Sequence, residues 1–91
     1  MFTACENKGF QITFPNEWTV SVQWGPFNYC ENKNFDDAYN EPSKRLTWNC
    51  PDAEIAAWDG AGKWYEFEND TVQGHVTPAE ALEFMNMISG K

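Results

Sequence analysis

The chain has 91 residues and a formal net charge of −8, with 42% hydrophobic and 16% aromatic residues. This length predicts a single domain spanning residues 1–91, and the aromatic content excludes global disorder. The six basic residues are scattered along the chain rather than clustered, whereas binding to nucleic acid or anionic membrane needs grouped Lys and Arg. The sequence therefore predicts neither a nucleic-acid partner nor a membrane partner.

Two runs near the N-terminus alternate apolar and polar side chains. They are FQITF at residues 10–14 and WTVSVQW at residues 18–24, and a period of two is typical of half-buried strands. Between them, Pro15-Asn16-Glu17 has the composition of a turn. We therefore expect a hairpin with one apolar face toward the core and one neutral, hydrogen-bonding face.

Residues 25–43 follow as a long irregular segment containing two prolines, and loops of this length are usually functional or disordered. RLTWNC (Arg45–Cys50) predicts a third strand. AEIAAWD (Ala53–Asp59) and KWYEF (Lys63–Phe67) flank Gly60-Ala61-Gly62 and predict a second hairpin. TVQGHV (Thr71–Val76) predicts a short last strand.

The C-terminal segment carries the signals of one helix. Thr77 is expected at the N-cap, Pro78 at the first helical position and Glu80 at the third, which together form a capping box. Apolar residues recur at helical spacing up to Ile88, and Gly90 suits a C-cap. The sequence thus predicts an α+β fold, in which about five to six antiparallel strands support one packed C-terminal helix.

The three cysteines, Cys5, Cys30 and Cys50, include no CxxC pair and are odd in number. They predict free thiols of a cytoplasmic protein rather than a zinc ligand set or a disulfide framework. The N-terminus lacks the pattern of a signal peptide, and no apolar run approaches the roughly twenty residues that span a bilayer. We expect a soluble protein.

Catalytic chemistry has little support in the residue pattern. His75 is the only histidine, and Cys30 or Cys50 would have to pair with it as a nucleophile, but no spacing favours this. The acidic residues lack the spacing of a calcium loop, and no glycine-rich phosphate loop is present. We therefore expect no enzyme activity, no metal and no cofactor.

The segment SVQWGPFNYCENKNF (Ser21–Phe35) combines aromatic rings with amides and is the best candidate for a binding site. Its rings suit stacking on a planar ligand, and its asparagines suit recognition of the ligand's edge. A basic side chain, Lys44 or Arg45, suits a phosphate. A second aromatic group lies on the expected hairpin. The candidate ligand-binding residues are Gln23, Trp24, Phe27, Asn28, Tyr29, Asn32, Arg45, Trp58 and Trp64. The alternative is that the rings form the core and the asparagines form turns.

WTVSVQWGPFNYCENKN, AEIAAWD, WYEF and VQGHVTPAEALEFM resemble a group of small proteins of tailed bacteriophages. The Trp/Phe-Gly-Pro-x-Asn-Tyr-Cys core is the most specific part of the resemblance, which covers most of the chain after the first few residues. The resemblance implies a phage origin and a place in the host cytoplasm. It also implies action against the host, either as a sponge for nucleotide messengers of immunity or as an inhibitor of a host protein.

The leading hypothesis is a non-catalytic anti-defence protein that sequesters a nucleotide-like signal, such as an ADP-ribose derivative or a cyclic nucleotide. Self-association into a homo-oligomer, such as a dimer, is expected, because it would increase the burial of so small a domain. One alternative is an acidic inhibitor that binds a host protein directly. A third is a small Cys–His hydrolase that uses His75.

Overall fold

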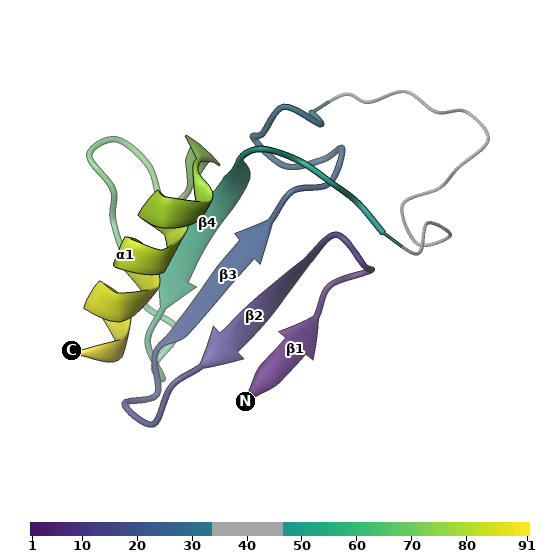
Figure 1. Ribbon diagram of the computed structural model, residues 1–91. Helices are drawn as coiled ribbons and strands as arrows, with labels where there is room; N and C mark the ends of the chain where they lie inside the picture. Colours follow the sequence, from purple (N-terminus) through teal and green to yellow (C-terminus); the bar gives the residue numbers. More distant parts are fainter. Residues whose placement is uncertain (34–46) are drawn as a thin grey trace.

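The computed structural model describes residues 1–33 and 47–91, and in this part five antiparallel strands form one sheet in chain order, with a single helix on one face (Figure 1). The elements are β1 (Phe2–Ala4), β2 (Gly9–Thr13), β3 (Thr19–Gln23), β4 (Ala53–Trp58), β5 (Gln73–Val76) and α1 (Pro78–Ser89). The predicted α+β arrangement, an antiparallel sheet with a packed C-terminal helix, is confirmed.

The first predicted hairpin is present as β2 and β3. Phe10 pairs with Val22 and Ile12 with Val20, so both apolar sets share one face. The connecting turn closes through the Glu17 N–H, which donates to the Phe14 carbonyl at 2.9 Å. Alternation of side chains along each strand therefore separates a face that packs under α1 from a neutral face.

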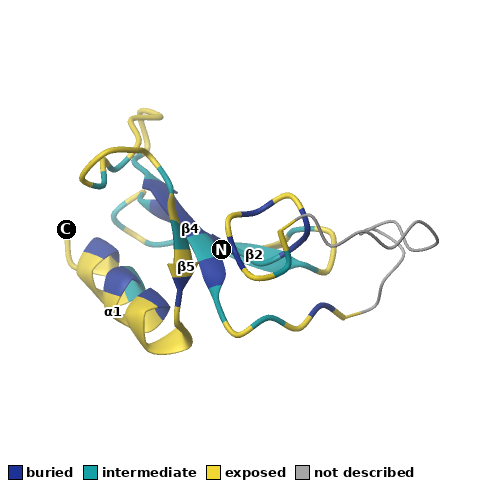
Figure 2. Cartoon of the chain, turned by 90° about the horizontal axis from the view of Figure 1, so that it is seen from above, coloured by how far each residue is buried: buried dark blue, intermediate teal, exposed yellow. Residues whose placement is uncertain are grey.

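The core lies between α1 and the central strands (Figure 2). Val20, Ala57 and Ile88 are fully buried there, and Phe84 is nearly so. The helix packs on β3 and β4, which leaves the β1–β2 half of the sheet less covered (Figure 1). Phe10 and Ile12 of β2 are accordingly only partly buried.

The predicted caps of α1 are also present. The Glu80 N–H donates to Thr77 Oγ1 at 3.3 Å, and the Thr77 N–H donates to Glu80 Oε1 at 3.0 Å. Gly90 is the C-cap residue. The amide of Asn16, in the β2–β3 turn, donates to the Ile88 carbonyl at 2.9 Å and so ties the end of the helix to the sheet.

Two predicted strands differ from the structure. Residues 47–50 are not in a strand; Trp48 is buried there, and its carbonyl accepts the indole N–H of Trp24. Arg45 and Leu46 lie outside the described residues. Residues 63–67 form only an isolated bridge, between Trp64 and Trp58. Beyond that bridge, Tyr65 and Phe67 pack on Phe84 of the helix. The N-terminal strand β1 was not predicted.

Candidate functional site

The segment from Gly25 to Lys33, here called the aromatic loop, is shaped by its own asparagines. Asn28 is buried, and its Oδ1 accepts the Gly25 N–H at 2.9 Å. Asn32 Nδ2 donates to the carbonyls of Trp24 at 2.8 Å and Asn49 at 3.1 Å. These two predicted binding residues therefore use amide groups to build the loop.

The aromatic loop packs against the N-terminal end of β4 and against β5. The Tyr29 N–H donates to the Glu54 carboxylate, and the Tyr29 carbonyl accepts the His75 N–H, both at 2.9 Å. Gly74 permits this approach, because a Cβ there would lie 2.5 Å from Tyr29 Cβ. The rings of Phe27 and Tyr29, both predicted binding residues, point to solvent with 75% and 52% exposure.

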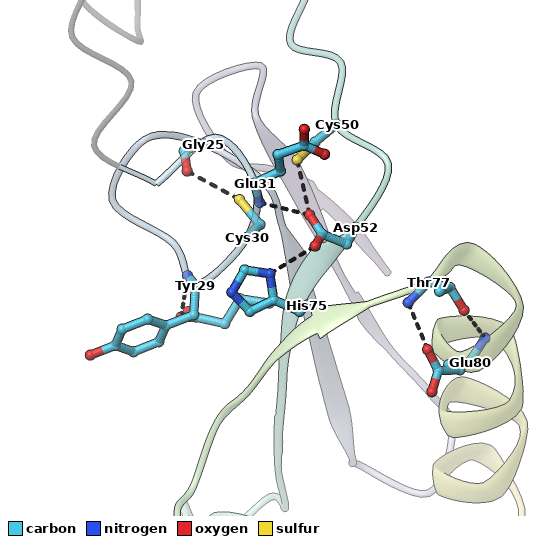
Figure 3. Close-up of polar contacts among 10 residues, drawn as sticks. Gly25, Tyr29, Cys30, Glu31, Cys50, Asp52, His75, Thr77 and Glu80 are labelled. Carbon is cyan, nitrogen blue, oxygen red and sulfur yellow. Dashed lines mark hydrogen bonds and ion pairs between the residues drawn. The ribbon is translucent and has the colours of Figure 1, made fainter.

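Cys30, Cys50, Asp52 and His75 meet at the base of the aromatic loop, and we call them the Cys–Asp–His cluster (Figure 3). Asp52 lies at its centre. Its Oδ1 accepts the Glu31 N–H at 2.7 Å and the Cys50 thiol at 3.2 Å, and its Oδ2 lies 2.8 Å from His75 Nδ1. The cluster therefore joins the loop, the residues before β4, and β5.

A bulge in β5 presents His75 to this cluster. Ala53 pairs with Val76 and Ile55 pairs with Gln73, so β5 has one extra residue. His75 lies between the paired residues Gln73 and Val76, within the bulge, and has a left-handed φ of 53°. Bulges redirect side chains and often occur beside functional sites. Here the bulge lets His75 reach Asp52 although its backbone N–H also bonds Tyr29.

The surroundings of the cluster favour a charged Asp52 carboxylate and a neutral Cys30 thiol. The Glu31 N–H, with smaller contributions from His75 and Cys50, holds the pKa of Asp52 below its usual value. Burial raises the pKa of the Cys30 thiol to about 11. A thiol with a raised pKa is a poor nucleophile, because the thiolate is the reactive form.

The contacts do not form a nucleophile–base pair. Cys30 Sγ donates to the Gly25 carbonyl at 3.5 Å, and Cys50 Sγ donates to Asp52. Within residues 1–33 and 47–91, no hydrogen bond joins a thiol to His75. The predicted alternative of a Cys–His hydrolase requires such a contact, so the geometry does not favour it.

Beside the cluster lies a pocket of about 290 Å³ between the sheet and the first turns of α1, here called the apolar pocket. Phe10 and Trp24 line it, and their rings pack edge to face with centroids 6.4 Å apart. Its lining residues are Phe10, Val22, Trp24, Cys50, Pro51, Asp52, Ala53, Val76, Pro78, Ala81 and Met85. The pocket exists because α1 covers only part of the sheet.

The other predicted binding residues are placed elsewhere. Trp58 and Trp64 stack with ring centroids 4.8 Å apart, but Trp58 pairs with Thr19 at the end of β3 opposite to Trp24. Gln23 faces away from the helix and bonds Ser21 and Lys8. Arg45 lies outside the described residues. Among the predicted site residues that the structure describes, Trp24 alone lines the apolar pocket.

Sequence reasoning missed Asp52 as the centre of a site, and it considered His75 only as a possible partner of a cysteine, not of Asp52. The local signal was present in Cys50-Pro51-Asp52, which places a thiol and a carboxylate two residues apart immediately before β4. The separation of 23 residues between Asp52 and His75 carried no such signal. Only the pairing of β4 with β5 brings them together.

Comparisons with known proteins give no relative for this chain: no family model matches it, and neither curated proteins nor solved structures match. Among the described residues, no helix has the length and apolar character needed to cross a bilayer.

Proposed function

We propose that this protein binds and sequesters a small nucleotide-derived molecule without catalysing its conversion. The apolar pocket beside the aromatic loop carries this proposal. Small-molecule sites are typically concave and mostly apolar, with a few polar groups that orient the ligand. The pocket has this composition, with Asp52 among mainly apolar residues.

The pocket suits the planar base of such a ligand. The rings of Phe10 and Trp24 offer flat apolar surface on the sheet side, and Pro78, Ala81 and Met85 contribute the helix side. Trp24 is held in place because its Nε1 donates to the Trp48 carbonyl at 2.6 Å. A fixed ring loses little freedom when a ligand stacks on it, which favours binding.

Asp52 sets the orientation of the ligand. A carboxylate accepts hydrogen bonds from the amino edge of a base and repels phosphate. The base therefore enters the pocket and the phosphate groups point away from Asp52. The phosphate partners proposed from the sequence, Lys44 and Arg45, belong to residues 34–46, outside the described part.

The resemblance to small phage proteins supports sequestration as the biological role. A sponge needs affinity and abundance, and it needs no reactive group. A nucleotide messenger of host immunity suits both the size of the apolar pocket and an anti-defence role, so we propose this ligand class. Assembly into a dimer belongs to the same proposal, because small domains gain burial by self-association.

Thermal unfolding with candidate ligands tests the pocket. We expect ADP-ribose derivatives or cyclic nucleotides to raise the Tm of the wild type, because a ligand bound only by the folded state stabilises it by about 2.7 kcal/mol at one hundred times Kd. Trp24→Ala is expected to lose this shift. Trp64→Ala is the matched control, because Trp64 lies at the far end of the sheet.

Circular dichroism of each variant establishes that it is folded before ligand is added. A shift that survives Trp24→Ala but is lost in Trp64→Ala would place the ligand at the Trp58–Trp64 pair instead. No shift with any nucleotide would reject the proposed ligand class.

A second candidate function is direct binding to a host protein, and the exposed rings of the aromatic loop favour it. Phe27 and Tyr29 present apolar surface to solvent beside acidic residues such as Glu31. Aromatic side chains are enriched in the centre of protein interfaces. Phe27→Ser would weaken capture of a host partner under this candidate and leave nucleotide binding in the apolar pocket unchanged.

A further inference from the structure

We propose that Cys30, Cys50 and Asp52 form a binding site for a divalent transition-metal ion, with zinc as the best fit. One ligand atom from each residue, two sulfur atoms and one carboxylate oxygen, lies within 4.8 Å of the others. The proposal stands without the proposed function, because it rests on the Cys–Asp–His cluster and needs no organic ligand.

The spacing of the three atoms is close to that of a zinc site. Zinc–sulfur bonds of about 2.3 Å and zinc–oxygen bonds of about 2.0–2.2 Å give tetrahedron edges of roughly 3.5–3.8 Å. Cys50 Sγ and Asp52 Oδ1 are 3.2 Å apart. No two of the three ligand atoms are more than 4.8 Å apart. Side-chain rotations that move these atoms by roughly 1 Å therefore bring them to the spacing of a zinc site.

The donor types decide which metal fits. Two thiolates are soft ligands and select zinc or similar ions, whereas magnesium and calcium prefer sites made only of oxygen. Both thiols release a proton when the metal binds, and the negative charges of the two thiolates and Asp52 are then balanced in part by the ion. Three protein ligands leave one coordination position for water.

The surrounding contacts hold the ligands in place before the metal arrives. Cys30 is buried, and its N–H donates to the Asn28 carbonyl at 2.9 Å. The Glu31 N–H and His75 hold the two oxygens of Asp52. Groups that orient a metal ligand in this way usually contribute about 10- to 100-fold to metal affinity. His75 is therefore a positioning residue for Asp52.

The competing use of the same two thiols is a disulfide between Cys30 and Cys50, which lie close enough for a small movement to join them. The carboxylate distinguishes the two possibilities. A disulfide gains nothing from Asp52, whereas a metal site uses it as a ligand. The hydrogen bonds that converge on Asp52 favour the metal site.

Titration of the full-length protein with Co²⁺ and then Zn²⁺, in a non-thiol reductant, tests the proposal. We expect one ion per chain, with thiolate-to-cobalt charge transfer and the intense visible bands of tetrahedral cobalt, which zinc then displaces. Cys50→Ser should reduce the intensity of the charge-transfer band, because one thiolate ligand remains, and should weaken binding by more than about 100-fold, beyond the usual effect of an orienting group.

Cys5→Ser is the matched control, because Cys5 lies before the β1–β2 turn and outside the cluster. It should bind both ions as the wild type does. His75→Gln should weaken binding by about 10- to 100-fold and keep the tetrahedral cobalt spectrum, since His75 orients Asp52 without binding the ion.

Alkylation of the wild type adds a measurement that needs no variant. Zinc should protect Cys50, the partly exposed thiol of the site, from a thiol reagent and leave the reactivity of Cys5 unchanged. Equal metal binding by Cys5→Ser and Cys50→Ser would overturn the proposal. So would a fully reduced protein that takes up no zinc, or one in which a Cys30–Cys50 disulfide forms whether or not zinc is present.

Discussion

At the scale of single residues, Asp52 links three separate segments of the chain. Its carboxylate binds the Glu31 N–H of the aromatic loop, the Cys50 thiol and the His75 ring. Hydrogen bonds to an ionised acceptor are stronger than neutral ones, so this carboxylate contributes to loop position as well as to the two proposed binding functions.

Glu80, like Asp52, has a lowered pKa, and its place in the capping box gives a pH dependence that can be tested. Hydrogen bonds from Thr77 lower the pKa of Glu80 from its usual 4.5. A carboxyl group whose pKa is lower in the folded than in the unfolded protein stabilises the fold at pH values above its unfolded-state pKa. This contribution is lost as the pH falls through its folded-state pKa. We expect urea unfolding of Glu80→Gln to show a smaller loss of stability between pH 6 and pH 3 than the wild type shows.

Thr77→Ala supplies the companion variant. It removes the hydroxyl that caps Glu80 N and should lower the free energy of unfolding by about 1 kcal/mol at neutral pH. If Glu80→Gln and the wild type lose stability in parallel as the pH falls, the capping box does not contribute to the pH dependence.

At the scale of elements, the docking of the aromatic loop on β5 depends on Gly74. A methyl group there would lie 2.5 Å from Tyr29 Cβ and 2.6 Å from the Tyr29 carbonyl oxygen. Gly74→Ala is therefore expected to displace the loop and cost about 1–3 kcal/mol in the free energy of unfolding, measured with urea. It should also weaken metal binding, because Cys30 moves with the loop.

Gly90→Ala is the control for that substitution. The closest atoms to a Cβ at Gly90 are 3.7 Å away, an ordinary contact, and its φ of −91° suits any residue. We expect it to keep wild-type metal affinity. A Gly74→Ala protein with unchanged stability and unchanged metal affinity would show that the loop does not need this close approach.

The elements that the sequence predicts correctly are those specified by nearby residues. Alternation and a short turn suffice for the β2–β3 hairpin, and a capping box and helical spacing suffice for α1. Residues 47–50 and 63–67 have strand-like composition, yet contacts from distant parts of the chain decide their structure. Trp48 meets Trp24, and Tyr65 meets Phe84, so tertiary packing overrides local preference.

At the scale of the whole molecule, the helix covers β3 and β4 and leaves open the apolar pocket that β2 also lines. The sequence identifies the aromatic residues as candidate binding residues but does not show which of them lie close together in the fold. Trp24 and Trp58 occupy opposite ends of the sheet because of strand register, and the Cys–Asp–His cluster arises because the loop and β5 meet beside β4. Such long-range contacts have no local signature in a single sequence.

The most direct test of sequestration is to identify what the protein retains from cells whose nucleotide-based immune signalling has been triggered. Purified protein is mixed with their extract, freed of unbound small molecules, denatured, and analysed by mass spectrometry. We predict an intact nucleotide derivative released by the wild type and by Trp64→Ala but not by Trp24→Ala. A protein that releases no nucleotide, or releases a chemically altered one, would contradict the account.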